Sequence, residues 1–197
     1  YSGVELAMDP NQPLAFGHRP EGISAEEQKN EFDYIDKINR LAAVEYPDDQ
    51  QLAARIRSYE LAFRMQTAVP ETVQFADETE ETLELYGVGK EPTDTVARLM
   101  LSARRFAERG VRFTLVYPSP YSAWDSHTKL QQNHSKLCRQ IDQPVAGLLK
   151  DLKRRGMWDD TVVVFCTEFG RTPGLEVLNG EMTGRDHHPH GFSIWLA

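Results

Sequence analysis

The chain has 197 residues, of which 40% are hydrophobic and 26% are charged, and its formal net charge is −8. This composition is ordinary for a globular protein, while the acidic balance argues against a general nucleic-acid-binding or anionic-membrane-binding surface. No apolar run approaches the roughly 20 residues that a membrane-spanning helix needs. We therefore expect no membrane span and no nucleic-acid partner.

The two ends of the chain suggest that it is a piece of a longer protein. It begins YSGVELAMDP, without an initiator Met, and it stops within the apolar run SIWLA. We expect the sequence to be a fragment that lacks an N-terminal part.

Residues 1–92 are predicted to form a mainly helical region. Ser24 and Glu27 have the spacing of a capping box, and apolar residues recur at helical spacing after them. This pattern predicts a helix over about 24–44. A turn and a second amphipathic helix, reaching about Thr67, follow it.

Residues 93–197 are predicted to be an α/β portion of the same larger domain. A strand, a long helix and a second strand form a βαβ unit, in which the two strands lie parallel. The fold class expected is therefore α/β, with a partial parallel sheet flanked by helices. A truncated sheet exposes an edge, so self-association is expected there. The predicted elements are a helix ending at Gly110, a strand at 111–117, a helix at 130–155, a strand at 161–166 and a strand at 192–197.

Polar side chains follow both strands of the predicted βαβ unit. Asp125 and His127 come after the first strand, Glu168 comes after the second, and His187 lies in a later loop. Because the carboxyl ends of parallel strands meet at one edge of a sheet, these four side chains are expected to converge. Carboxylate and imidazole ligands suit Zn, Mn or Fe better than Ca. The pattern predicts a divalent-metal site, although a loop Asp and His are also often solvated or capping groups.

Two arginines accompany these candidate ligands. Arg171 and Arg185 would suit an anionic substrate such as a phosphate or sulfate. They could equally neutralise the neighbouring carboxylates, Glu168 among them. No Gly-rich phosphate loop and no G-x-S-x-G nucleophile elbow is present in the sequence.

Four motifs resemble those of a known family. They are SYELAFRMQ at 58–66, WDSH at 124–127, TEFGRTP at 167–173 and GRDH at 184–187. Their order and spacing resemble the bacterial DUF1501 proteins, which are sulfatase-like members of the alkaline phosphatase superfamily. The resemblance implies an alkaline-phosphatase-like sheet, a bimetal hydrolase ancestry and export by an upstream twin-arginine signal.

The resemblance also implies roles for individual residues. Asp125, His127 and His187 look like the three ligands of one superfamily metal. Where the superfamily has an Asp-His pair for the second metal, this chain has Glu168 and Phe169, and the phenyl ring cannot bind a cation. The nucleophilic Ser or Thr is expected upstream of Tyr1.

The resulting hypothesis is a fragment of a metal-dependent hydrolase that acts on small sulfate or phosphate esters. Asp125, His127, Glu168 and His187 would bind metal, and two arginines, Arg171 and Arg185, would bind the ester. The fragment alone is expected to be inactive, because its nucleophile lies elsewhere. The alternative is a non-catalytic binding or structural protein that keeps the fold, and Phe169 favours that alternative.

Overall fold

The computed structural model describes residues 5–6, 22–45, 50–51, 54, 69–167 and 169–197. Contacts divide the chain into two compact units, Tyr1–Asp77 and Glu78–Ala197. The division expected at residue 92 concerned parts of one larger domain, and it stays a prediction. None of the helices in the described ranges is both long and apolar enough to cross a membrane.

The first unit contains one long described helix, α1 (Ala25–Glu45). The Ser24 hydroxyl accepts from the Glu27 N–H at 3.1 Å, and the Glu27 carboxylate accepts from the Ser24 N–H at 2.8 Å. The predicted capping box and the helix that it begins are therefore confirmed. The second predicted helix, which reaches Thr67, falls largely outside the described residues.

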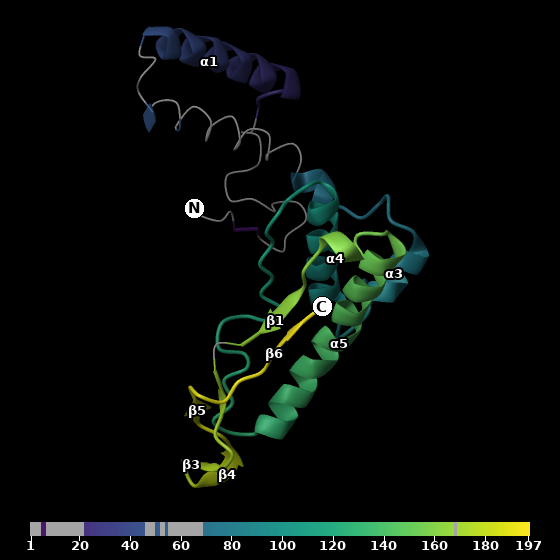
Figure 1. The fold of residues 1–197 in the computed structure, drawn as a ribbon, viewed down its shortest axis with the longest axis vertical. Coiled ribbons are helices and arrows are strands. Elements are labelled where there is room, and N and C mark those ends of the chain that lie inside the picture. The colour runs from purple at the N-terminus through teal and green to yellow at the C-terminus, as the bar shows by residue number, and fades with distance from the viewer. Residues whose placement is uncertain (1–4, 7–21, 46–49, 52–53, 55–68, 168) are drawn as a thin grey trace. The chain divides into compact units, whose positions relative to one another are not determined.

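The second unit combines three α-helices with short strands (Figure 1). The helix that was predicted to end at Gly110 and the helix predicted over residues 130–155 are both present. Pro144 lies inside the last of them, which continues through it. The elements are α3 (Glu80–Tyr86), α4 (Asp94–Glu108), α5 (Leu130–Arg154), the 3-10 helix η1 (Trp158–Asp160), β1 (Val164–Cys166), β2 (Gly170–Arg171), β3 (Glu176–Leu178), β4 (Glu181–Gly184), β5 (His187–His188) and β6 (Ile194–Leu196).

The predicted parallel α/β sheet is wrong. The described strands form three separate two-stranded antiparallel sheets, β1 with β6, β2 with β5 and β3 with β4. Residues 111–117 form no strand and pair with no strand of the described chain. An alternating pattern indicates that a segment fits a pleated surface, but it names neither the partner nor its direction. Here the segment that reaches β1 is β6, which returns antiparallel to it (Figure 1).

The core of the second unit lies where α3, α4 and α5 pack together (Figure 1). Tyr86 of α3, Leu101 of α4 and Leu152 of α5 are each at most 1% exposed. Gly147 lets α5 approach α3 closely, because a Cβ there would lie 2.9 Å from the backbone oxygen of Leu85. Helix-on-helix packing of this kind needs only three amphipathic faces, which the sequence supplies.

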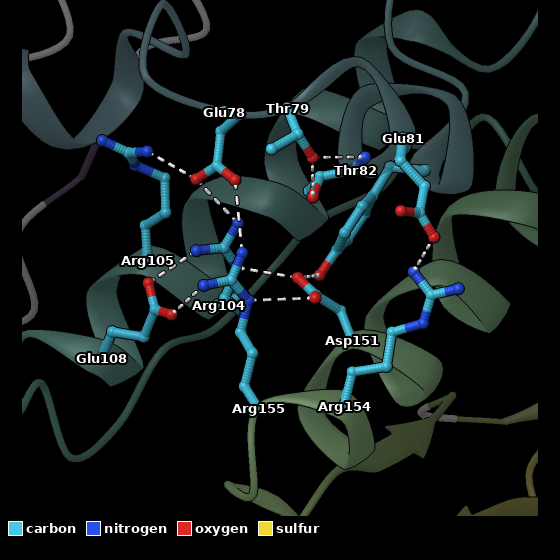
Figure 2. A network of polar contacts seen from close by, with 11 residues as sticks. Glu78, Thr79, Glu81, Thr82, Arg104, Arg105, Glu108, Asp151, Arg154 and Arg155 are labelled. Carbon is cyan, nitrogen blue, oxygen red and sulfur yellow. Dashed lines mark hydrogen bonds and ion pairs between the residues drawn. The ribbon is translucent and has the colours of Figure 1, made fainter.

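A network of charged side chains is buried among the same helices (Figure 2). Arg104 of α4 is 1% exposed and meets three carboxylates, each from a different part of the chain. Its nitrogens lie 2.7 Å from Glu78, 2.5 Å from Glu108 and 3.0 Å from Asp151. Its contacts with Glu78 and Asp151 have ion-pair distances without hydrogen-bond alignment. The charge of Arg104 is therefore balanced inside the helical core.

Two further arginines complete this network. Arg155 at the end of α5 contacts Asp151 at 3.0 Å and Glu108 at 2.8 Å, and Arg105 contacts Glu78 at 2.5 Å (Figure 2). Three guanidinium groups thus face three carboxylates, and together they join α4, α5 and the segment before α3. Tyr86 donates to Asp151 at 3.1 Å. Burial and the Asp151 charge raise the pKa of the Tyr86 hydroxyl far above its usual range, so this tyrosine stays neutral.

Arg104→Leu is expected to lower the free energy of unfolding by about 3–5 kcal/mol, because it removes the buried positive charge that lies between Glu78 and Asp151 and leaves three carboxylates against two guanidinium groups. Urea unfolding followed by circular dichroism measures this change. Arg154→Leu is the matched control, since Arg154 and its partner Glu81 are both exposed, and its cost is expected to be about 0–1 kcal/mol. Equal costs for the two variants would contradict a structural role for the buried network.

Candidate functional site

Three segments of the second unit meet around the carboxylate of Asp125. Asp125 and His127 lie in the loop before α5, Arg171 lies in β2 and His187 lies in β5. The antiparallel pairing of β2 with β5 places Arg171 directly opposite His187. The loop and the β2–β5 ribbon therefore bring together side chains that are far apart in the sequence.

One oxygen of Asp125 is approached by three nitrogen atoms. Oδ1 lies 2.9 Å from His187 Nε2 and 3.0 Å from His127 Nε2. Arg171 Nη2 donates to the same oxygen at 2.5 Å. The hydrogen bond from Arg171, followed by that from His187, lowers the pKa of Asp125 from 3.8 to about 2. Asp125 is therefore a permanently charged acceptor at neutral pH.

Ser126, between the two loop candidates, anchors the loop to its surroundings. It is 2% exposed, and its hydroxyl accepts from Asn133 Nδ2 of α5 at 3.3 Å. Its carbonyl oxygen accepts from the Arg185 N–H, also at 3.3 Å. The loop is thus attached on one side to the first turns of α5 and on the other to the segment between β4 and β5.

Arg171 joins the loop to the β2–β5 ribbon. Besides Asp125, its guanidinium donates to the carbonyl oxygens of Trp124 at 3.2 Å and Arg185 at 3.0 Å. Only 16% of its side chain is exposed. The structure therefore gives Arg171 a clear part in holding Asp125, while the binding of an anionic substrate by Arg171 and Arg185 stays a prediction.

The β3–β4 hairpin contacts the Nδ1 edge of the His127 ring, away from the Nε2 atom that lies near Asp125. Glu176 of β3 places Oε2 2.6 Å from His127 Nδ1. Glu176 is paired in register with Gly184 of β4, and the Lys129 N–H donates to Thr183 Oγ1 of the same hairpin at 2.9 Å. The Glu176 carboxylate raises the pKa of His127, and Asp125 adds to the effect against the opposing influence of burial. His127 is therefore enclosed between two carboxylates.

Two groups of side chains in the described residues could hold a metal ion. In each group the candidate ligand atoms all lie within 4.8 Å of one another. Nitrogen and oxygen donors at this spacing suit Zn, Mn or Fe. The two groups are Asp125 with His127 and His187, and His127 with Glu176 and Asp186.

The remaining predicted residues are placed differently. Glu168 lies outside the described residues. Phe169 packs its ring against His187, with centroids 4.5 Å apart. The rings of His188 and His190 are nearly perpendicular, in an edge-to-face arrangement with centroids 6.3 Å apart. Glu176 was not predicted, because it lies outside the four motifs and a single Glu carries no sequence signal, and only the hairpin brings it to His127.

A family model described as "Protein of unknown function (DUF1501)" matches residues 1–197. The chain belongs to the DUF1501 family. Comparison with curated proteins found no match. Comparison with solved structures found none either. The resemblance carried by the four sequence motifs is thereby confirmed, and the function of this DUF1501 chain has to be argued from its site.

Gly184 of this DUF1501 chain tests how the site is assembled. A Cβ at this position would lie 1.9 Å from the backbone oxygen of His127, and backbone atoms cannot move aside independently. Gly184→Ala is expected to displace the loop from the hairpin and to lower the free energy of unfolding by about 1–3 kcal/mol. Urea unfolding and the imidazole NMR signals of His127 measure the two effects.

Gly174→Ala is the control for this substitution, because a Cβ there meets nothing within 4 Å. It is expected to leave both the stability and the His127 signals unchanged. If Gly184→Ala behaved like Gly174→Ala, the close approach between the hairpin and the loop would be contradicted.

Because the pKa of Asp125 is lowered in the folded protein, its contribution to stability should decrease as the pH falls. A carboxyl group whose pKa is depressed in the folded state stabilises the protein above its unfolded pKa of 3.8, and this stabilisation is lost as the pH falls towards about 2. The stability difference between the wild type and Asp125→Asn, measured by thermal unfolding without added metal, should therefore shrink over that interval. A constant difference from pH 5 to pH 2 would contradict the assignment.

Proposed function

We propose that this DUF1501 chain binds a divalent cation, Zn, Mn or Fe, through Asp125, His127 and His187, and that the site serves hydrolysis of small sulfate or phosphate esters. The observation that supports the proposal most directly is the approach of two imidazole Nε2 atoms to one carboxylate oxygen, at 2.9 and 3.0 Å. Two imidazoles and a carboxylate are a common ligand set for a catalytic metal that keeps one position open.

The surroundings of His127 also favour a cation at this site. Its Nδ1 and Nε2 each lie against a carboxylate, Glu176 on one side and Asp125 on the other. A neutral ring has only one N–H, so it can donate to only one of these carboxylates. The raised pKa of His127 shows that the environment favours positive charge on the ring. A metal ion on Nε2 would meet the same demand.

Each side chain then has a definite task. Asp125 supplies a negative charge that Arg171 keeps ionised, and the two histidines supply neutral nitrogen donors. When bound, the cation would act as a Lewis acid that polarises an ester oxygen or a water molecule. Arg171 and Arg185 would balance the charge of the anionic ester. The nucleophile is expected upstream of Tyr1, in an exported protein, as the family resemblance implied.

A second candidate function is non-catalytic binding, and the position of Phe169 favours it. Its ring packs on His187 at the place in the motif where the superfamily has a second metal-binding histidine. A phenyl ring supports the histidine but offers no ligand. A protein with one cation site could bind an anionic ester without cleaving it.

Calorimetry with Zn, Mn and Fe and metal analysis after dialysis test the cation site. One ion per chain is expected for the wild type. Asp125→Ala and His187→Ala should each reduce the affinity by more than the roughly 10–100-fold that loss of an outer-sphere partner costs. His190→Ala is the matched histidine control, since its ring faces His188, and it should leave the affinity unchanged.

A panel of aryl sulfate and phosphate esters, assayed with the full-length protein, separates the two candidate functions. Turnover that Asp125→Ala abolishes would establish hydrolysis, whereas ester binding without turnover would favour the binding protein. If the wild type neither retains nor binds a cation, the proposed metal site is excluded for the hydrolase and for the binding protein.

A further inference from the structure

We infer that Glu176 is a positioning residue that fixes the ring orientation and tautomer of His127, so that Nε2 is presented to the cation. This inference rests on the proposed function and adds to it a residue that does not itself contact the ion. Its physical basis is the 2.6 Å contact between Glu176 Oε2 and His127 Nδ1.

The contact bears on which ring nitrogen carries the proton. An ionised carboxylate can only accept hydrogen bonds, so the 2.6 Å contact with Glu176 is a hydrogen bond when the ring proton is on Nδ1. The Nε2 contact to Asp125 is longer, at 3.0 Å, and Asp125 Oδ1 already receives Arg171 and His187. The neutral ring is therefore expected to keep its proton on Nδ1, which leaves the Nε2 lone pair available for a cation.

The fold holds Glu176 where this contact requires it. Glu176 is at the start of β3 and pairs with Gly184 at the end of β4. Gly184 in turn lies so close to the His127 backbone that a Cβ would overlap its carbonyl oxygen. The hairpin therefore places the backbone of Glu176 beside the loop of His127, and the Glu176 side chain reaches the imidazole from there.

A carboxylate behind a metal-binding histidine has known consequences. It orients the ring, selects the tautomer and increases the basicity of the ligating nitrogen, and its loss usually costs about 10–100-fold in metal affinity. Glu176 is 24% exposed, which leaves the contact partly shielded from water. Asp186, an exposed residue, offers a further carboxylate oxygen within 4.8 Å of the candidate ligand atoms of His127 and Glu176.

The test compares Zn affinity, measured by calorimetry, in Glu176→Gln and Glu176→Ala. Both substitutions remove the charge, but the Gln side-chain oxygen can still accept from Nδ1. Positioning predicts a loss of about 10–100-fold for Ala and a clearly smaller loss for Gln. Val177→Ala is the control in the same strand, because Val177 is 63% exposed, and it should bind Zn like the wild type.

A second measurement needs no metal. ¹⁵N NMR of the imidazole at a pH where His127 is neutral reports its tautomer. The wild type and Glu176→Gln should keep the proton on Nδ1, whereas Glu176→Ala should move it to Nε2, which still faces Asp125. Thermal unfolding of each variant checks that the chain remains folded.

Several results would overturn the inference. They are equal Zn affinities for the Gln and Ala variants, an Ala variant that binds like the wild type, and a His127 tautomer that does not respond to Glu176. Binding of two Zn ions by the wild type, with one lost in both variants, would make Glu176 a direct ligand instead. If the wild type binds no cation, the proposed function fails, and the tautomer measurement alone decides whether Glu176 positions the ring.

Discussion

The buried charge of Arg104 is the constraint on which the helical part of the structure depends. A guanidinium that is 1% exposed requires carboxylates at fixed distances, because an unpaired buried ion is strongly destabilising. Glu78, Glu108 and Asp151 meet this requirement from the segment before α3, from α4 and from α5. The relative placement of the three helices is thus specified by charge as well as by apolar packing. Helix α5 also begins three residues after His127, so the ion pairs that position α5 also position the end of the loop that carries Asp125 and His127.

The candidate site is held together differently from the helical core. It has little apolar burial, and its parts are joined by polar contacts that converge on one carboxylate oxygen. Arg171 attaches the loop of Asp125 to the β2–β5 ribbon, and the β3–β4 hairpin attaches His127 to Glu176. A positively charged arginine beside a candidate cation site is consistent with a carboxylate that must stay ionised and with a substrate that carries negative charge. The proposed function would therefore combine cation binding with anion binding in one small region.

The sequence was most informative where structure is local. Periodicity and capping residues are properties of neighbouring positions, so the helix near residues 24–44, the helix ending at Gly110 and the helix at 130–155 were predictable. The buried role of Arg104 was not, since an arginine in an amphipathic helix is usually exposed. The pairing of strands was also not predictable, because the alternation at 111–117 and the β-branched run at 161–166 indicate strands without indicating their neighbours.

The convergence of three side chains was predicted correctly, but the way in which the chain brings them together was not. Convergence of Asp125, His127 and His187 was expected from two parallel strands that share one sheet edge. The structure brings the three together through a loop and an antiparallel ribbon instead. Residue chemistry and motif order therefore carried more information than the assumed topology. Glu176 depends on hairpin register, a long-range property that no local pattern contains.

The contrast between a charged helical core and a polar, partly exposed site has a consequence for motion. Segments with few buried apolar contacts open at a much lower free energy than the whole protein unfolds. The Lys129 and Arg185 N–H groups, which bond to Thr183 and Ser126, sit at the joint between loop and hairpin. Hydrogen exchange at these two amides would proceed by local opening, whereas exchange at the amides of α4 and α5 would require global unfolding. A ligand that bridges the joint would slow the first class of amides and leave the second unchanged, which makes these two amides direct reporters of occupancy.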